Sequence, residues 1–423
     1  MGCNLPLKIV YMVPYAPTRI RTRPFHLIRA LAAEGHEVTL VTSCGHPDED
    51  SALEELAACG VRIVAERLSI PRSLWNCLSA LPTPDPMQSR YSWKPRLAHR
   101  LIEATRQLSP VDVVHVEHLR GARYGLAVLA AMESGRIPRA AVVWDSVDCI
   151  SSLFRRAADQ SETPLVRAAA RFELPRTTRY EPRVAARFDR VLMTSEVDRQ
   201  ELLELARRHS ANLAENCVQV VPNGVDLEYF HPSGDTREAR TLVMTGKMSY
   251  HANATAAVRF VKDVMPSVWA RLPDARLWIV GKDPPADVVK LGEGRVVVTG
   301  TVADIRPFLR KAAIAVAPIQ YGVGIQNKVL EALAMNVPTV ASANGSGGLI
   351  TTEGIRPPLT VAPASDPARF AAILVERLRA AAADPTPPTE GRTFVERYFT
   401  WERAGDLLEG VLRDAATERT EAR

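Results

Sequence analysis

The chain has 423 residues, of which 46% are hydrophobic and 24% charged. At roughly 100–200 residues per domain this length predicts two or three domains, and the composition excludes an intrinsically disordered chain. No run approaches the ~18 consecutive apolar residues of a transmembrane helix. The first residues show neither a secretory signal nor a myristoylation pattern. The sequence therefore predicts a cytoplasmic protein.

The net charge is +5, and the sequence lacks the strong basic stripe that is usual in nucleic-acid-binding proteins. No nucleic-acid partner is therefore predicted. One denser patch, from Arg155 to Arg190, holds nine arginines against five acidic residues. This patch is either a solvated helical face or a surface that contacts anionic lipid or an anionic substrate. The second interpretation would place the protein peripherally on the inner face of the cytoplasmic membrane.

The first half of the chain alternates between short apolar runs and helically spaced segments, which is typical of a parallel sheet with crossover helices. The expected strands are 8–14, 36–42, 61–65, 111–116, 140–144 and 190–194, and the expected helices are 25–34 and 51–58. Between Leu68 and Pro95 this pattern stops, and the Pro-, Ser- and Trp-containing segment is expected to be a loop.

The second half repeats the alternation after a Pro222-Asn-Gly224 turn and a polar linker. A strand that begins at Val218 runs into this turn. The expected strands after the linker are 241–246, 276–281, 295–300, 313–317 and 338–342, and the expected helices are 254–271, 304–311, 328–335, 366–382 and 401–416. The sequence thus predicts two doubly wound α/β halves joined near 221–240. In such sheets the ligands bind at the carboxyl ends of the strands, and two facing halves would form an interdomain cleft.

Several other functions lack their sequence signatures. The first strand is not followed by the Gly-x-Gly-x-x-Gly loop of a dinucleotide-binding domain, and in Gly322-Val-Gly324-Ile-Gln-Asn327 the third glycine is replaced by asparagine. There is no Walker A sequence and no Gly-x-Ser-x-Gly elbow. Asp48-Glu-Asp50 matches an Asp-x-Asp metal site in form, but acids clustered on a polar loop are usually only solvated. No metal site is therefore predicted, and the six cysteines, with no Cys-x-x-Cys pair, are expected to be reduced thiols.

The segment 318–338 carries the strongest chemical signal, because a strand is followed by a glycine-containing loop and then by a helix. The loop lets backbone N–H groups approach a ligand, and the helix N-terminus attracts anions. Lys328 lies in the first turn, where a cation opposes the helix dipole. Glu331 lies on the same face. This pair is either an ordinary surface pair or a site where Lys328 binds phosphate and Glu331 binds sugar hydroxyls.

Two further strand ends carry polar residues. Gly246-Lys247 follows the first strand of the second half, and two lysines at one edge could stabilise a departing diphosphate. In the first half, His115-Val-Glu117-His118 ends a strand, where a histidine is either structural or in contact with substrate.

These residues resemble glycosyltransferase family 4, which contains retaining enzymes of the GT-B fold. The resemblance rests on Val221-Pro-Asn-Gly-Val-Asp226, on Thr245-Gly-Lys-Met-Ser-Tyr-His-Ala-Asn253 and on Gly324 to Pro338, and it covers nearly the whole chain. Val116-Glu-His-Leu-Arg-Gly121 adds a resemblance to the sugar transferases of exopolysaccharide loci associated with PEP-CTERM sorting.

The resemblance implies roles for individual residues. The implied catalytic residues are His118, which would touch the donor sugar, and Lys247 and Lys328, which would contact the donor diphosphate. The implied donor-binding residues are Gly246, Lys247, Val302, Gly324, Ile325, Lys328 and Glu331, with Glu331 on the ribose.

Two departures from the family pattern affect these roles. Val323 stands where the first glutamate of the family's pair belongs, so direct carboxylate contact with the donor sugar is in question. The glycine-rich loop after the first strand is replaced by Thr18-Arg-Ile-Arg-Thr-Arg23. We expect Arg21 or Arg23 in this loop, together with Glu117, to contact an anionic acceptor.

The resemblance implies a metal-independent hexosyltransferase that acts in exopolysaccharide or other cell-surface glycan synthesis. Its acceptor-binding domain would span 1–225 together with a returning helix at 400–423, and its donor-binding domain 226–399. The expected partners are a nucleotide-sugar donor, with UDP favoured over GDP, and a glycan or lipid-linked acceptor, and no cofactor is expected. The alternatives are a nucleotide-sugar-binding accessory protein and a nucleotide-sugar epimerase.

Overall fold

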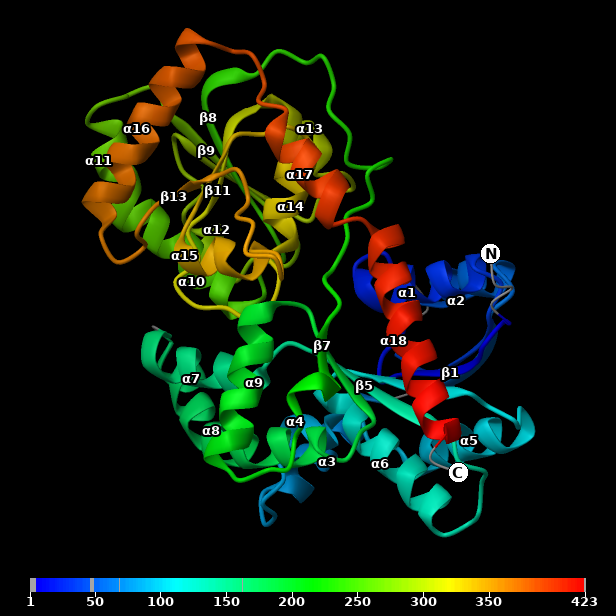
Figure 1. Cartoon of the computed structure of the whole chain (residues 1–423). Helices are drawn as coiled ribbons and strands as arrows, with labels where there is room; N and C mark the ends of the chain where they lie inside the picture. The colour runs from blue at the N-terminus through cyan, green and yellow to red at the C-terminus, as the bar shows by residue number, and fades with distance from the viewer. Residues whose placement is uncertain (1–4, 46–48, 68, 162, 422–423) are drawn as a thin grey trace. The chain divides into compact units, whose positions relative to one another are not determined.

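A computed structural model of the chain describes residues 5–45, 49–67, 69–161 and 163–421 (Figure 1). The chain divides into two compact units. Unit 1 contains 1–154, 170–223 and 401–423, and unit 2 contains 155–169 and 224–400. The sequence had instead placed 155–169 in the first domain. Within the described residues, no helix has both the length and the apolar character needed to span a membrane.

Unit 1 is built on a parallel seven-stranded sheet with the strand order β3-β2-β1-β4-β5-β6-β7. Its strands are β1 (Lys8–Val13), β2 (Glu37–Cys44), β3 (Arg62–Arg67), β4 (Val113–Glu117), β5 (Ala141–Val147), β6 (Arg190–Met193) and β7 (Val218–Val220). Its helices are α1 (Thr22–Ala33), α2 (Asp50–Ala58), α3 (Ile70–Ala80), α4 (Met87–Tyr91), α5 (Pro95–Gln107), α6 (Leu119–Glu133), α9 (Glu196–Arg208) and α18 (Trp401–Glu421). The boundary at 154/155 falls within α7 (Ile150–Gln160), and that at 169/170 falls within α8 (Pro164–Ala185).

Both faces of this sheet are buried, which explains why its strands are continuous apolar runs. Along β1, Val10 and Met12 point into one core cluster, whereas Ile9, Tyr11 and Val13 point into the other. The second cluster includes one face of α18, which packs on α1.

The segment from Leu68 to Pro95 was wrongly predicted to be a loop, because it contains α3 and α4. Three of the large apolar side chains of α3 are exposed, whereas Ser73 and Asn76 are buried. The buried Asn76 donates from Nδ2 to the backbone carbonyls of Tyr91 and Trp93, at 3.2 and 2.8 Å. A periodicity that assumes an apolar inner face does not detect such a helix.

Unit 2 contains a parallel six-stranded sheet with the order β10-β9-β8-β11-β12-β13. Its strands are β8 (Glu238–Thr245), β9 (Arg276–Val280), β10 (Val296–Gly300), β11 (Ala312–Ala317), β12 (Thr339–Ala341) and β13 (Thr360–Val361). Its helices are α10 (His251–Arg259), α11 (Met265–Trp269), α12 (Ala286–Val289), α13 (Arg306–Lys311), α14 (Asn327–Ala334), α15 (Ala343–Ser346), α16 (Pro367–Ala383) and α17 (Glu390–Tyr398). The prediction of two doubly wound α/β halves is confirmed, although β13 and α17 were not predicted.

The strand orders of the two units correspond. In each unit the first strand lies inside the sheet, and the order in which later strands are added changes from one side of it to the other. The reversal lies between β1 and β4 in unit 1 and between β8 and β11 in unit 2. Ligands of open α/β sheets bind beyond the carboxyl ends of the strands at this switch point. Functional residues are therefore expected in the segments that follow these four strands.

The packing of α18 offers a matched test, because Leu408 is fully buried whereas the neighbouring Leu407 is 38% exposed. Leu408→Ala should lower the free energy of unfolding of unit 1 by about 2–5 kcal/mol, since it removes core contacts and leaves a cavity. Leu407→Ala should change it by less than about 0.5 kcal/mol. Urea unfolding followed by circular dichroism measures both variants, and equal losses would contradict the described seating of α18.

Candidate functional site

In unit 2 the carboxyl ends of β8 and β9 touch backbone to backbone. Gly246 follows β8 with a φ of +144°, a conformation that side chains disfavour. Gly281 follows β9, and a Cβ on it would lie 1.8 Å from the carbonyl oxygen of Gly246. Only glycine at position 281 permits this approach, which fixes the position of Gly246-Lys247 at the edge of the sheet.

The loop between β11 and α14 is held in a similar way. Gly324 has a φ of +68°, and a Cβ on Gly348 would lie 2.2 Å from the carbonyl oxygen of Gly324. On the other side of the loop, the hydroxyl of Ser342 donates to the carbonyl of Ile319 at 2.5 Å. The buried Tyr321 contacts Nδ1 of His251 through its hydroxyl at 3.0 Å. The glycine loop is thus fixed before any ligand binds.

Lys328 is brought to the strand end of β8 by a chain of hydrogen bonds. Its Nζ donates to Oδ1 of Asn253 at 2.5 Å, and Nδ2 of Asn253 donates to the carbonyl of Lys247 at 2.9 Å. A Cβ on Gly246 would lie 3.7 Å from Nζ of Lys328. The structure therefore brings together Gly246, Lys247 and Lys328, as the sequence predicted. It adds Asn253, the last residue of the motif 245–253, which was not predicted to be part of the site.

The electrostatics of α14 follow from burial. Burial lowers the pKa of Lys328 to about 8, and the nearby carboxylate of Glu331 opposes this shift. Burial likewise raises the pKa of Glu331 to about 7, opposed by Lys328. Among the described residues no carboxylate lies within ion-pair distance of Nζ of Lys328, whose bonded partner is the neutral amide of Asn253. The ammonium group can therefore accept an anion without first breaking a salt bridge.

Two other predicted donor-binding residues, Ile325 and Val302, have side chains that pack in the core. Ile325 is 9% exposed and its side chain packs with Val329 and Leu330, so only its backbone faces the loop. Val302 is half-buried and packs near Val243 and Val280. Contact between either residue and a donor remains a prediction.

In unit 1 the switch point holds Glu117 and His118 at the end of β4. Glu117 is 1% exposed, and it accepts hydrogen bonds from the hydroxyls of Tyr15 at 2.8 Å and Tyr11 at 3.4 Å. Burial, followed by the negative charge of Asp145 opposite it on β5, raises the pKa of Glu117 to about 8. Glu117 is therefore placed to position Tyr15, and its predicted contact with an acceptor would require this tyrosine to move.

His118 has a φ of +65° and caps α6, with Nδ1 accepting from the backbone N–H of Arg120 at 3.3 Å. Burial lowers the pKa of His118 to about 3, so the imidazole is neutral at physiological pH. Because Nδ1 accepts, the ring proton is assigned to Nε2. The positive φ is uncommon for a residue with a side chain and is typical of functional positions.

His115 does not have the substrate contact that the sequence left open. It is fully buried, its ring stacks on Tyr11 with centroids 4.0 Å apart, and Nε2 lies 3.8 Å from Oδ2 of Asp145. Burial lowers its pKa to about 3, which matches a neutral core residue.

The structure separates the two arginines that were predicted to bind an acceptor. Arg23 is 5% exposed, its Nη2 lies 2.7 Å from Oδ2 of Asp145, and Nη1 donates to the carbonyl of Val221 and to Oδ1 of Asn223. The prediction for Arg23 therefore does not fit its position, because the first turn of α1 directs this side chain into the core.

Arg21 lies in a different setting. Its side chain is 44% exposed and pairs with Glu49 at 2.7 Å, and its guanidinium carbon lies 5.2 Å from the ring centroid of Tyr15. A second cation, which the sequence did not predict, lies two residues after His118 in the first turn of α6. Arg120 is half-buried, stacks on Tyr91 at 4.6 Å and donates to Gln88 at 2.8 Å. We refer to Tyr15, Arg21, His118 and Arg120 as the unit 1 corner.

The Asp-x-Asp segment has a structural role where it is described. Asp48 lies outside the described residues, Asp50 begins α2, and Glu49 accepts from the backbone N–H of Gly45 at 2.7 Å. In the part of the chain that the structure covers, no cluster of three or more His, Cys, Asp or Glu side chains is arranged to hold a metal ion.

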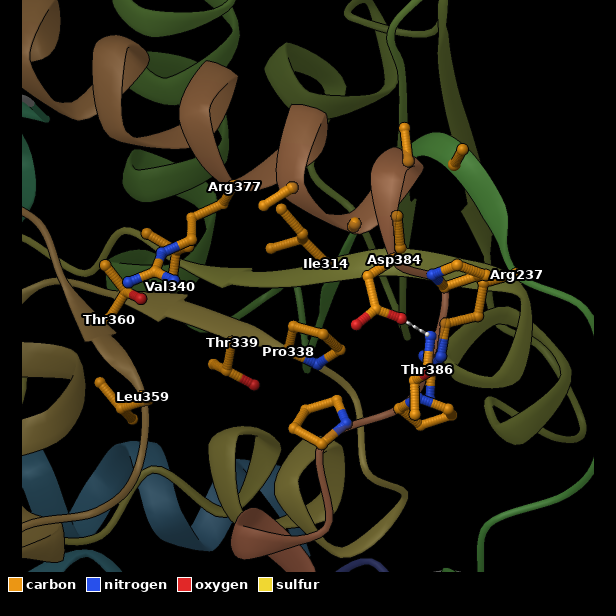
Figure 2. A pocket seen from close by; sticks show the side chains of 18 of the residues that line it. Arg237, Ile314, Pro338, Thr339, Val340, Leu359, Thr360, Arg377, Asp384 and Thr386 are labelled. Carbon is orange, nitrogen blue, oxygen red and sulfur yellow. Dashed lines mark hydrogen bonds between the residues drawn. The ribbon is translucent and has the colours of Figure 1, made fainter.

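A pocket of about 550 Å³ lies elsewhere in unit 2 (Figure 2). Its walls include Ile314 of β11, Val340 of β12 and the Pro-rich segment 385–388. Arg237 on its wall donates to the carbonyls of Ala312, Met335 and Asn336. These residues lie toward the amino ends of β11 and β12, whereas Gly246 and Lys328 lie toward the carboxyl ends. The pocket is therefore separate from the predicted donor residues.

The close approach of Gly348 to Gly324 gives a direct test of the loop geometry. Gly348→Ala should lower the stability of unit 2 by about 1–3 kcal/mol, because the added Cβ forces the loop to shift. Gly347→Ala is the matched control, since a Cβ there would meet nothing within 4 Å. Thermal unfolding measures both variants. If Gly348→Ala were as stable as Gly347→Ala, the described contact would be wrong.

Comparison with known proteins agrees with this arrangement. A family model described as Glycosyltransferase Family 4 matches residues 22–229, and one described as Glycosyl transferases group 1 matches residues 239–380. The alpha-maltose-1-phosphate synthase of Mycobacterium tuberculosis is 28% identical in an alignment of 237 residues, which covers 50% of this chain and 59% of that protein. The matched region thus spans about three fifths of the length of this curated relative.

Solved structures resemble the whole chain. A glycosyltransferase from Rickettsia africae has a TM-score of 0.66 at 13% identity and covers 97% of this chain and 98% of its own. Anabaena Alr3699/HepE in complex with UDP-glucose has a TM-score of 0.65 at 12% identity and covers 96% of this chain and 100% of its own. These likenesses confirm the predicted GT-B fold. The two family models, which together match most of the chain, show that it is a glycosyltransferase and belongs to family 4.

Proposed function

We propose that this glycosyltransferase moves a hexose from UDP-sugar to a hydroxyl of an anionic, lipid-linked glycan, with retention of the anomeric configuration. The observation that carries this proposal is the half-buried Lys328, which has no carboxylate partner among the described residues and lies beside the glycine strand end of β8. A preorganised cation in this position favours a group that gains negative charge during the reaction. The departing UDP is such a group.

The donor half of the proposal assigns one task to each part of the unit 2 edge. The backbone N–H groups of the Gly324 loop and the ammonium groups of Lys247 and Lys328 would bind the diphosphate, and Glu331 would bind the ribose. The UDP preference is supported by the neighbour Alr3699/HepE, which was solved with UDP-glucose. Two lysines supply the charge that a divalent cation supplies in other transferases, so we propose that transfer is independent of metal and cofactor.

The acceptor half rests on the unit 1 corner. Arg21 stacks on Tyr15, whose ring centroid lies 6.2 Å from that of His118, and Arg120 follows His118 in the first turn of α6. Guanidiniums bind phosphate and carboxylate groups with matched geometry, so this corner fits an anionic acceptor. The neutral His118 would donate from Nε2 to a sugar hydroxyl or carbonyl oxygen rather than act as a charged group.

In the proposed reaction, the bond between the anomeric carbon and the UDP oxygen breaks while Lys328 stabilises the negative charge on UDP. The acceptor hydroxyl attacks the same face of the sugar, and its proton passes to the departing UDP oxygen as the new glycosidic bond forms. Retention, an exopolysaccharide product and action at the cytosolic face of the membrane rest on the resemblance to exopolysaccharide transferases.

Val323 favours a second candidate, an accessory protein that binds the donor without transferring it, because no glutamate stands at that position.

Lys328→Ala should reduce turnover by about 10²–10³, because it removes one preorganised group that stabilises the leaving charge. Release of UDP from UDP-glucose in the presence of a membrane-lipid extract measures this rate. Lys290→Ala, which removes an exposed lysine of the same unit, is the control and should leave the rate unchanged. An unchanged rate in Lys328→Ala at saturating donor would refute the assignment. Donor binding without UDP release in the wild type would support the accessory protein.

The pKa of Lys328 predicts how donor binding depends on pH. Since this pKa is about 8 in the free protein, the lysine is protonated below that pH and binds the diphosphate there. Affinity for UDP-glucose should therefore fall by up to about tenfold per pH unit above pH 8. Lys328→Met should remove this dependence. Calorimetry across this range tests it, and a wild-type affinity that rises with pH would contradict the sign.

A further inference from the structure

Helix α3 exposes an apolar side that no described residue of unit 1 covers. Leu74, Trp75 and Leu78 are 59%, 64% and 58% exposed, and Leu81 directly after the helix is 43% exposed. Single exposed apolar residues are common on soluble proteins, but a contiguous group containing tryptophan is typical of an interaction surface.

The orientation of α3 is fixed by its other side. Ser73 and Asn76 are buried, and Asn76 is bonded to the carbonyls of Tyr91 and Trp93. Turning the helix over would bury Trp75 but would leave these buried polar groups without their partners. The outward apolar side is therefore built into the packing of α3 on α4.

Helix α8 extends this surface and adds positive charge. Arg176 donates from Nη2 to the carbonyl of Leu81 at 2.8 Å, which joins α8 to the end of α3. The same guanidinium stacks on Phe172, which is 44% exposed, with 4.2 Å between the guanidinium carbon and the ring centroid. Phe172, Arg176 and Arg179 are spaced so that they lie on one stripe of the helix.

The border of this surface is cationic. Arg72, Arg171 and Arg179 are exposed, and among the described residues none of them forms an ion pair with a carboxylate. Residues 70–81 contain no acidic side chain. An apolar centre with tryptophan and leucine inside an arginine border is the composition of a helix that lies in the interface of an anionic bilayer.

We propose that the lipid-docking surface, formed by Leu74, Trp75, Leu78, Leu81 and Phe172 with Arg72, Arg171, Arg176 and Arg179, seats unit 1 on an anionic membrane. The charge favours this occupant over a second copy of the chain, because a symmetric dimer through this face would bring two arginine borders together. The apolar side chains would enter the acyl boundary while the guanidiniums remain at the phosphates.

The position of α3 links membrane docking to acceptor binding, and this link rests on the proposed function. Asn76 holds the backbone of Tyr91, and Arg120 of the unit 1 corner stacks on the ring of that same tyrosine. One side of α3 thus faces the membrane while its other side is linked to the corner proposed for the acceptor. A lipid-linked acceptor could then reach the corner without leaving the bilayer.

Sedimentation with vesicles tests the surface without requiring transfer. The full chain should bind vesicles of phosphatidylcholine mixed with phosphatidylglycerol and bind phosphatidylcholine alone much more weakly. Trp75→Ser should reduce the partition coefficient at least about tenfold, and Trp75→Ser with Leu78→Ser about a hundredfold, from the apolar area lost. Arg171→Ser with Arg179→Ser should reduce binding to anionic vesicles by roughly tenfold or more. Leu407→Ser, which alters an exposed leucine on α18, should bind like the wild type.

Equal vesicle binding by the wild type and by Trp75→Ser with Leu78→Ser would overturn the proposal. So would a wild type that fails to bind vesicles, and sedimentation of the protein alone would then show whether a second copy covers this face instead. Calorimetry with UDP separates this result from the proposed function, because the α3 variants should bind UDP as the wild type does. Loss of UDP binding in Lys328→Ala with normal vesicle binding is the reciprocal result.

Discussion

The ammonium group of Lys328 is bonded to the neutral amide of Asn253, and the arrangement of the unit 2 edge depends on this contact. Asn253 in turn holds the carbonyl of Lys247, so one amide links α14, α10 and the end of β8. The adjacent backbone can approach so closely only because position 281 is glycine. Burial removes the Lys328 ammonium from water, which is unfavourable in the free protein and lowers the pKa of this lysine. The same charge becomes favourable when an anionic ligand arrives.

Unit 1 distributes its charges differently. One of its buried cations, Arg23, is neutralised by Asp145 and ties α1 to β5 and to the segment after β7. Removing one partner of such a pair leaves an uncompensated buried charge, so this pair is better understood as a structural element than as a ligand site. The exposed Arg21 and the half-buried Arg120 lie in the segments that follow β1 and β4 at the same switch point. The two units thus share one topology, but the loops after their strands carry different chemistry.

The sequence predicted the fold well because buried parallel strands are apolar runs of the right length, and because glycines and prolines mark their ends. It also predicted Gly246, Lys247 and Lys328 as neighbours, since parallel strands end at one edge. It did not predict α3, whose buried face is polar, nor the burial of Arg23, whose partners Asp145 and Asn223 lie far away in the chain. Asn253 and Arg120 were missed for a related reason: an uncharged amide on a helix and an arginine in an arginine-rich chain carry no distinctive local signal.

The central claim is that the carboxyl edge of the unit 2 sheet binds the donor through Lys328 and the glycine loop. A crystal structure of the protein with UDP-glucose tests it most directly. The account predicts the diphosphate within hydrogen-bond distance of Nζ of Lys328 and of the backbone N–H groups of the Gly324 loop. A diphosphate bound at the amino ends of β11 and β12, in the pocket beside Arg237, or anywhere out of reach of Lys328 would contradict it.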